Sequence, residues 1–128
     1  LEVLVVDDGS TDETYDIVSR EFEGEARVRA IHKENGGKSS ALNLGISLAK
    51  GEIVVVMDAD TIFRSDTVSK LVAHFVDPAV GAVAGNAKVG NRINLITRWQ
   101  ALEYIVAQNL DRRAFERLNC ITVVPGAV

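Results

Sequence analysis

The chain is poor in cysteine, in basic residues and in long apolar runs. Its single cysteine, Cys120, can form no internal disulfide and no cysteine-based zinc site, which favours a reducing compartment. Lysine and arginine number 14 against 18 aspartates and glutamates, and the net charge of −4 argues against nucleic acid as a partner. The longest apolar run, Ile53–Met57, is far shorter than the roughly 20 residues of a transmembrane helix, and no signal peptide opens the chain, so we expect a soluble chain.

What the chain does contain is the composition of one globular domain. Apolar residues make up 47% of its 128 residues and charged residues 25%, a balance too apolar for intrinsic disorder. Leu1 opens directly into an apolar run, and the chain stops two residues after Pro125-Gly126. Because complete domains usually begin and end in polar residues, we expect residues 1–128 to be part of a longer protein.

Strand and helix patterns alternate along the chain. Apolar or alternating residues predict strands at Leu1–Val6, Ala26–His32, Ile53–Met57, Val80–Ala87 and Ile121–Val124. Helical spacing, with a capping box of Ser10 and Glu13 at the first start, predicts helices at Thr11–Glu23, Lys38–Lys50, Ser65–Val76 and Asn94–Leu118. The last is one helix or two in tandem, with Trp99, Tyr104 and Phe115 expected in its core; the alternative for Trp99 is stacking on a sugar ring. This order predicts an α/β fold with a mostly parallel sheet flanked by helices, in which Leu1–Val6 is a central strand covered on both faces.

Two of the predicted strands end in aspartates. Asp7 and Asp8 follow the first strand, and Asp58 and Asp60 follow Ile53–Met57. Ligands of parallel sheets bind beyond the carboxyl ends of the strands, so we expect both acidic ends at one edge. Residues two apart in extended backbone point to the same side, so Asp58 and Asp60 suit Mg²⁺ or Mn²⁺, although aspartates also serve as polar turn residues.

Asp7 and Asp8 are adjacent and therefore point to opposite sides of the backbone. At most one of them can face a given ligand, while the other orients the turn. The functional interpretation is an acceptor for the imide or amide N–H of a nucleobase. The alternative is an Asx-turn that precedes Gly9 and Ser10.

A glycine pair precedes the helix predicted at Lys38–Lys50. Gly36, Gly37 and Lys38 lie at its start, where N–H groups and the helix dipole favour phosphate and the lysine adds positive charge. A Walker A loop is disfavoured, because the position six residues before Lys38 is His32 rather than glycine. A glycine turn followed by a solvated lysine is the alternative.

The second acidic end also allows another enzyme class. In a haloacid-dehalogenase-type phosphatase with Mg²⁺, Asp58 would be the nucleophile. Such phosphatases place threonine or valine two residues after the second aspartate, where this chain has Ile62. This interpretation also leaves the first acidic turn without a role. His32 and His74 belong to no spaced cluster, and we expect surface or satisfied histidines at both positions.

Three ordered motifs, Val5–Asp12, Gly36–Asn43 and Met57–Thr61, carry a family resemblance. Together with Gly85-Asn86 and Thr97–Tyr104 they cover nearly the whole chain. The chain resembles the family 2 inverting glycosyltransferases of the GT-A fold. The likeness is greatest to the processive synthases of poly-N-acetylglucosamine, chitin oligosaccharides and hyaluronan.

The resemblance implies a role for each site residue. Asp8 would hydrogen-bond uracil, and Asp7 would support the turn. Lys38 would lie near the diphosphate, Asp58 would contact the ribose or the coordination shell of the metal, and Asp60 would bind Mn²⁺ or Mg²⁺. The implied activity is metal-dependent transfer of a sugar, N-acetylglucosamine as the best guess, from a UDP-sugar to a growing polysaccharide or oligosaccharide with inversion.

Two parts of the family pattern are missing from this partial GT-A domain of residues 1–128. The first strand of the family would precede Leu1 and pair beside it. The catalytic base would follow Val128, so no catalytic residue is assigned within the chain. Full-length relatives also carry transmembrane helices, which implies that the parent enzyme lies in the cell membrane with this domain on the cytoplasmic side. Glucose and glucuronate donors are as compatible with these residues as N-acetylglucosamine.

Overall fold

The computed structural model describes residues 1–85, 93–106 and 112–118. The chain divides into two compact units, Leu1–Val54 and Val55–Val128. Within the described residues, no helix combines the length and the apolar character that crossing a membrane requires.

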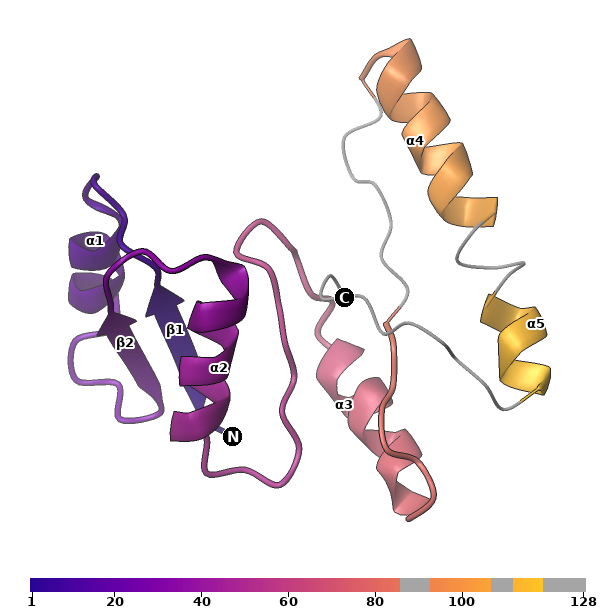
Figure 1. Cartoon of the computed structure of the whole chain (residues 1–128), viewed down its shortest axis with the longest axis horizontal. Coiled ribbons are helices and arrows are strands. Elements are labelled where there is room, and N and C mark those ends of the chain that lie inside the picture. The colour runs from indigo at the N-terminus through magenta and orange to yellow at the C-terminus, as the bar shows by residue number, and fades with distance from the viewer. Residues whose placement is uncertain (86–92, 107–111, 119–128) are drawn as a thin grey trace. The chain divides into compact units, whose positions relative to one another are not determined.

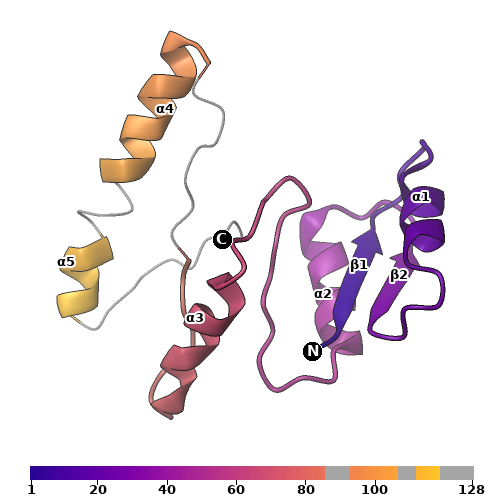
Figure 2. The same ribbon diagram turned by 180° about the vertical axis from the view of Figure 1, so that it is seen from behind.

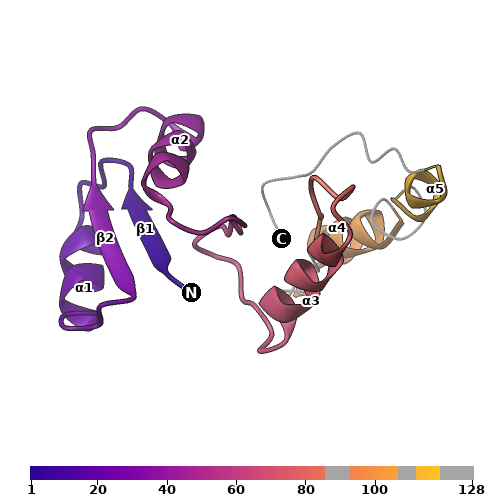
Figure 3. The same ribbon diagram turned by 90° about the horizontal axis from the view of Figure 1, so that it is seen from below.

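The first unit is a parallel strand pair with one helix on each face. β1 (Val3–Asp7) pairs with β2 (Val28–His32), and Asp7 lies opposite His32 in the register. α1 (Thr14–Glu21) connects the two strands, and α2 (Lys38–Leu48) follows β2. The two helices lie on opposite faces of the sheet (Figures 1 and 2), and the view from below shows the strands between them (Figure 3). The predicted α/β class, with a parallel sheet flanked by helices, is confirmed in this unit.

Alternation along β1 decides which groups meet each helix. A Cβ on Gly45 of α2 would lie 3.4 Å from Cγ2 of Val6, so this part of β1 packs closely against α2. Asp7 follows Val6 and therefore faces the α1 side of the sheet. There, the ring of Tyr15 from α1 contacts His32, with ring centroids 5.3 Å apart. The side chains of Val6 and Asp7, at the end of β1, thus lie on opposite faces of the strand pair.

The start of α1 differs from the prediction. The helix begins at Thr14, with Glu13 as its N-cap and without a capping bond from a side chain. Ser10 donates its hydroxyl and its N–H to Asp7 instead. Oδ1 of Asp12 accepts the Thr14 N–H at 3.0 Å. The predicted capping box is wrong because Glu13 rather than Ser10 is the N-cap, and the Ser10 N–H that Glu13 would accept is donated to Asp7.

Two predicted strands are wrong in the residues described. Residues 53–57 form no strand, and neither do residues 80–85. A strand needs a neighbouring strand to satisfy its backbone N–H and C=O groups. In the described part of the chain the sheet consists of β1 and β2 alone, so the apolar segment 53–57 has no strand partner. Met57 is accordingly 50% exposed, and β1 is mostly half-buried rather than covered on both faces. Residues 86–87 and the strand predicted at 121–124 lie outside the described residues.

The regular elements in the described part of the second unit are all helices. It contains α3 (Thr67–Ala73), the 3₁₀ helix η1 (His74–Val76), α4 (Leu95–Val106) and α5 (Arg112–Arg117). The helix predicted at 65–76 is confirmed as α3 followed by η1. The helix predicted at 94–118 is found as α4 and α5, with residues 107–111 outside the description. Trp99, Tyr104 and Phe115 are exposed rather than in a core, because no other described element packs against α4 or α5.

Candidate functional site

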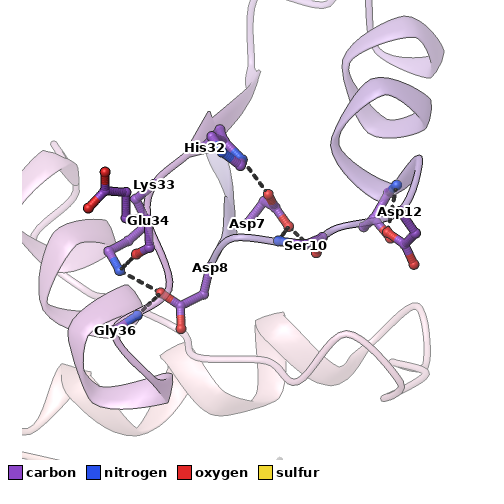
Figure 4. Close-up of polar contacts among 9 residues, drawn as sticks. Asp7, Asp8, Ser10, Asp12, His32, Lys33, Glu34 and Gly36 are labelled. Atoms are coloured by element: carbon purple, nitrogen blue, oxygen red, sulfur yellow. Dashed lines mark hydrogen bonds and ion pairs between the residues drawn. The ribbon is translucent and has the colours of Figure 1, made fainter.

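Two segments meet at the carboxyl end of the strand pair. The turn Asp7–Ser10 follows β1, and the loop Lys33–Gly37 follows β2. Because Asp7 lies opposite His32, both segments leave the sheet at the same edge, and the Lys33 N–H donates to the Asp7 carbonyl oxygen at 3.0 Å. Figure 4 shows their polar side chains converging at this edge.

Gly9 allows the two segments to touch. Its φ of +79° lies in the left-handed region, which a residue with a Cβ adopts only under strain. A Cβ at this position would lie 2.7 Å from the backbone nitrogen of Asn35 in the facing loop. Glycine is therefore required both by the turn and by the close approach of the loop.

This double requirement predicts a large loss of stability in Gly9→Ala. We expect the free energy of unfolding to fall by about 2–4 kcal/mol, because backbone strain adds to a collision that side-chain rotation cannot relieve. Gly24→Ala is the matched control, since Gly24 has a φ of +84° and no atom within 4 Å of an added Cβ. Its expected loss is about 1 kcal/mol, from strain alone. Urea denaturation followed by circular dichroism measures both losses, and equal values would contradict the contact with Asn35.

Asp7 is the buried carboxylate of the site, with 8% of the residue exposed. Oδ1 accepts the hydroxyl and the N–H of Ser10, and Oδ2 lies 2.6 Å from Nδ1 of His32. The Ser10 hydroxyl first, and the His32 contact after it, hold the pKa of Asp7 below its ordinary value of 3.8 against the opposing effect of burial. Asp7 is therefore ionised, and both of its oxygens are bonded by protein groups.

Asp8 points to the other side, toward the glycine loop (Figure 4). Oδ1 lies 2.5 Å from the Lys33 ammonium and accepts the Gly36 N–H at 3.0 Å. The Lys33 ammonium, followed by the N–H groups of Gly36 and Gly37, lowers the pKa of Asp8. The side chains of Lys33 and Asp8 are 18% and 21% exposed, so solvent or a ligand reaches the pair. Asp8 is thus an ionised acceptor with donors beside it.

Lys38 opens α2 next to this cluster. The helix begins after Gly37, whose φ is +81°, and no side chain caps its N-terminus. The side chain of Lys38 is exposed. The start of α2 and a cation therefore lie beside the loop that holds Asp8, an arrangement that can accommodate an anion.

Asp58 and Asp60 belong to the second unit. The Thr61 N–H donates to the Asp58 carbonyl oxygen at 3.0 Å, so residues 58–61 form a turn rather than extended backbone, and the expectation that the two side chains point to one side through strand alternation does not apply. Asp58 is half-buried and Asp60 is exposed. The described residues contain no group of three histidine, cysteine or acidic side chains that could hold a metal by themselves. Two carboxylates nevertheless fit Mg²⁺ or Mn²⁺, whose remaining ligands are commonly water and phosphate oxygens.

Two contributors to the first cluster were not predicted as site residues. Lys33 bonds Asp8, and His32 bonds Asp7. The available signal was the parallel pairing of two consecutive strands, because the last residues of such strands meet at one edge. The chain positions of His32 and Lys33, at the end of β2 and directly after it, correspond to those of Asp7 and Asp8 on β1.

Comparisons with known proteins extend over almost the whole chain. Residues 1–126 match the family model described as Glycosyl transferase family 2. Among similar proteins, the poly-beta-1,6-N-acetyl-D-glucosamine synthase of Staphylococcus aureus (strain COL) is 30% identical, and that of Staphylococcus epidermidis is 32% identical. Each alignment covers 98% of this chain and 31% of the relative, so the chain spans about a third of their length. No solved structure matches the chain significantly.

The matched region contains the acidic turn after β1, the glycine loop before α2 and the Asp58–Asp60 segment. The resemblance read from these motifs is therefore confirmed at the level of the family. The parallel strand pair, with helices on both faces, is part of a GT-A domain. The chain belongs to glycosyl transferase family 2.

Proposed function

We propose that this chain binds the nucleotide of a UDP-sugar, and that the protein transfers the sugar to a growing polysaccharide with inversion. The two staphylococcal relatives are named as synthases of poly-beta-1,6-N-acetyl-D-glucosamine, which supports N-acetylglucosamine as the sugar. Membrane association through segments outside these residues, with this domain on the cytoplasmic side, is part of the same proposal.

One observation carries the proposal: the Asp8 carboxylate has donors beside it. The imide edge of uracil presents an N–H between two carbonyl oxygens, so it needs one acceptor flanked by donors. Asp8 supplies the acceptor. The Lys33 ammonium donates to Asp8 Oδ1 and to the Glu34 carbonyl oxygen, which leaves one of its three N–H groups beside the carboxylate for a uracil carbonyl oxygen. Cytosine presents a bare ring nitrogen in place of the imide N–H, which would face the carboxylate without a proton between them. The cluster therefore favours uracil.

The remaining site residues suit the diphosphate. Lys38 and the N-terminus of α2 would attract its negative charge, and Asp58 and Asp60 would hold Mn²⁺ or Mg²⁺ against it. When bound, the cation would neutralise charge that develops on the leaving diphosphate. The four aspartates are engaged with the turn, the base or the metal, so the group that accepts the proton of the acceptor hydroxyl is proposed to lie outside these residues.

The experiment is a competition between UDP and CDP for this chain. We expect UDP to bind at least about tenfold more tightly, because a polar site discriminates strongly against a ligand that lacks the donor it is built to bond. Isothermal titration calorimetry with Mn²⁺ present gives both affinities. Comparable affinities would remove Asp8 from base recognition. Release of phosphate from p-nitrophenyl phosphate, abolished by Asp58→Asn, would favour the phosphatase interpretation instead.

A further inference from the structure

Asp7 has no oxygen left over for a ligand, although it precedes the residue proposed to read the base. Oδ1 is bonded by Ser10, and Oδ2 is bonded by Nδ1 of His32 at 2.6 Å. Asp7 is also the one charged residue that is buried among the described residues. A buried carboxylate is costly unless protein groups satisfy it, so its partners control where the backbone of this turn can lie.

His32 is the partner that comes from another element. It is the last residue of β2 and lies opposite Asp7 in the register, while Ser10 belongs to the same turn as Asp7. The Tyr15 ring of α1 lies against its imidazole at a tilt of 56°. The His32 ring is therefore held between β2 and α1, and its bond to Asp7 ties the turn after β1 to both elements.

We propose that His32 is a positioning residue for base recognition, acting through Asp7 on Asp8. This inference rests on the proposed function. Asp7 and Asp8 share a peptide unit, so fixing the Asp7 carboxylate on the α1 side fixes the direction in which Asp8 leaves on the α2 side. The bond from Nδ1 thereby sets the Asp8 carboxylate beside Lys33 and Gly36, where the uracil edge would pair.

The geometry assigns this role to a single atom of His32. Nδ1 bonds Asp7, and the side chain is 50% exposed. The Asp8 carboxylate is held on the other side of the turn, by the glycine loop (Figure 4). His32 therefore acts on the base site without touching the base, and a replacement that keeps a donor at the Nδ1 position should keep the function.

Two replacements separate that atom from the rest of the ring. In His32→Asn the side-chain amide nitrogen takes the place of Nδ1, and in His32→Gln the amide nitrogen takes the place of Nε2. We expect His32→Asn to keep the UDP-over-CDP affinity ratio within about twofold of wild type. We expect His32→Gln to lower that ratio about tenfold, the size of effect that misplacing one hydrogen bond to a charged group produces.

Calorimetry on the full chain gives the ratio, and circular dichroism confirms that each variant is folded at the temperature used. The ratio is the decisive quantity, because a general loss of folded protein lowers both affinities equally. If wild type prefers UDP and His32→Gln prefers it as strongly, or if both variants lose the preference equally, the inference about Nδ1 is overturned while the proposed function stands. If wild type shows no preference, the proposed function itself fails, and the inference with it.

Discussion

Asp8→Asn is expected to remove most of the preference for UDP over CDP. A carboxylate only accepts, so it pairs with the uracil N–H and repels the bare nitrogen of cytosine. A carboxamide carries both an acceptor and a donor, so asparagine can turn either group toward the base. The affinity ratio should therefore fall from at least about tenfold to within about threefold. Competition calorimetry with both nucleotides, in the presence of Mn²⁺, measures the change.

Asp12→Asn is the matched control for this replacement. Asp12 lies in the same segment, is exposed, and accepts the Thr14 N–H through a carboxylate oxygen that asparagine also provides. This variant removes the same charge four residues away and should keep the UDP preference. A full preference in Asp8→Asn would show that another group reads the base. A lost preference in Asp12→Asn would show that general charge, rather than Asp8, sets it.

The second large effect concerns the metal. UDP binding to the wild-type chain should strengthen at least about tenfold when Mn²⁺ replaces a metal-free buffer, because the cation would neutralise the diphosphate beside Asp60. Asp60→Asn should abolish this gain, because a neutral amide oxygen is a much weaker ligand for a hard cation. The same variant should leave the affinity in metal-free buffer unchanged. Calorimetry with and without Mn²⁺ gives all four affinities.

Asp77→Asn serves as the control in the same unit. Its carboxylate accepts the Ala79 N–H at 2.9 Å in a turn, and asparagine can keep that bond. The control should retain the whole gain from Mn²⁺. Equal UDP affinity of the wild-type chain with and without the metal would remove Asp58 and Asp60 from diphosphate binding, whatever the behaviour of the variant.

The first unit could be predicted from the sequence because its signals are local. The apolar run before Asp7 and the glycine pair before Lys38 mark β1 and α2 to within a few residues. The opposite directions of Asp7 and Asp8 follow from strand alternation alone, and the structure has them as predicted.

The predictions from the sequence failed for two kinds of interaction. One is a contact between residues that are distant along the chain, and the other is competition between nearby groups for the same partner. The bond between Asp8 and Lys33 joins residues 25 apart, and no local pattern encodes it. Ser10 had the right spacing for a capping box, but its N–H donates to Asp7, three residues before it, rather than to Glu13. The apolar run at 53–57 has the composition of a strand, yet a strand also requires a neighbour, and composition says nothing about that.

The proposed base site has a consequence for folding during synthesis. Its contacts all close within residues 7–36: Asp7 with His32, and Asp8 with Lys33 and Gly36. These bonds join residues 25 to 28 apart, so none of them needs a residue after Gly36. Because a chain emerges from the ribosome N-terminus first, the residues that would select the nucleotide can reach their places before the segment of Asp58 and Asp60 has left the ribosome. Base selection and metal binding would then mature as successive steps of biosynthesis.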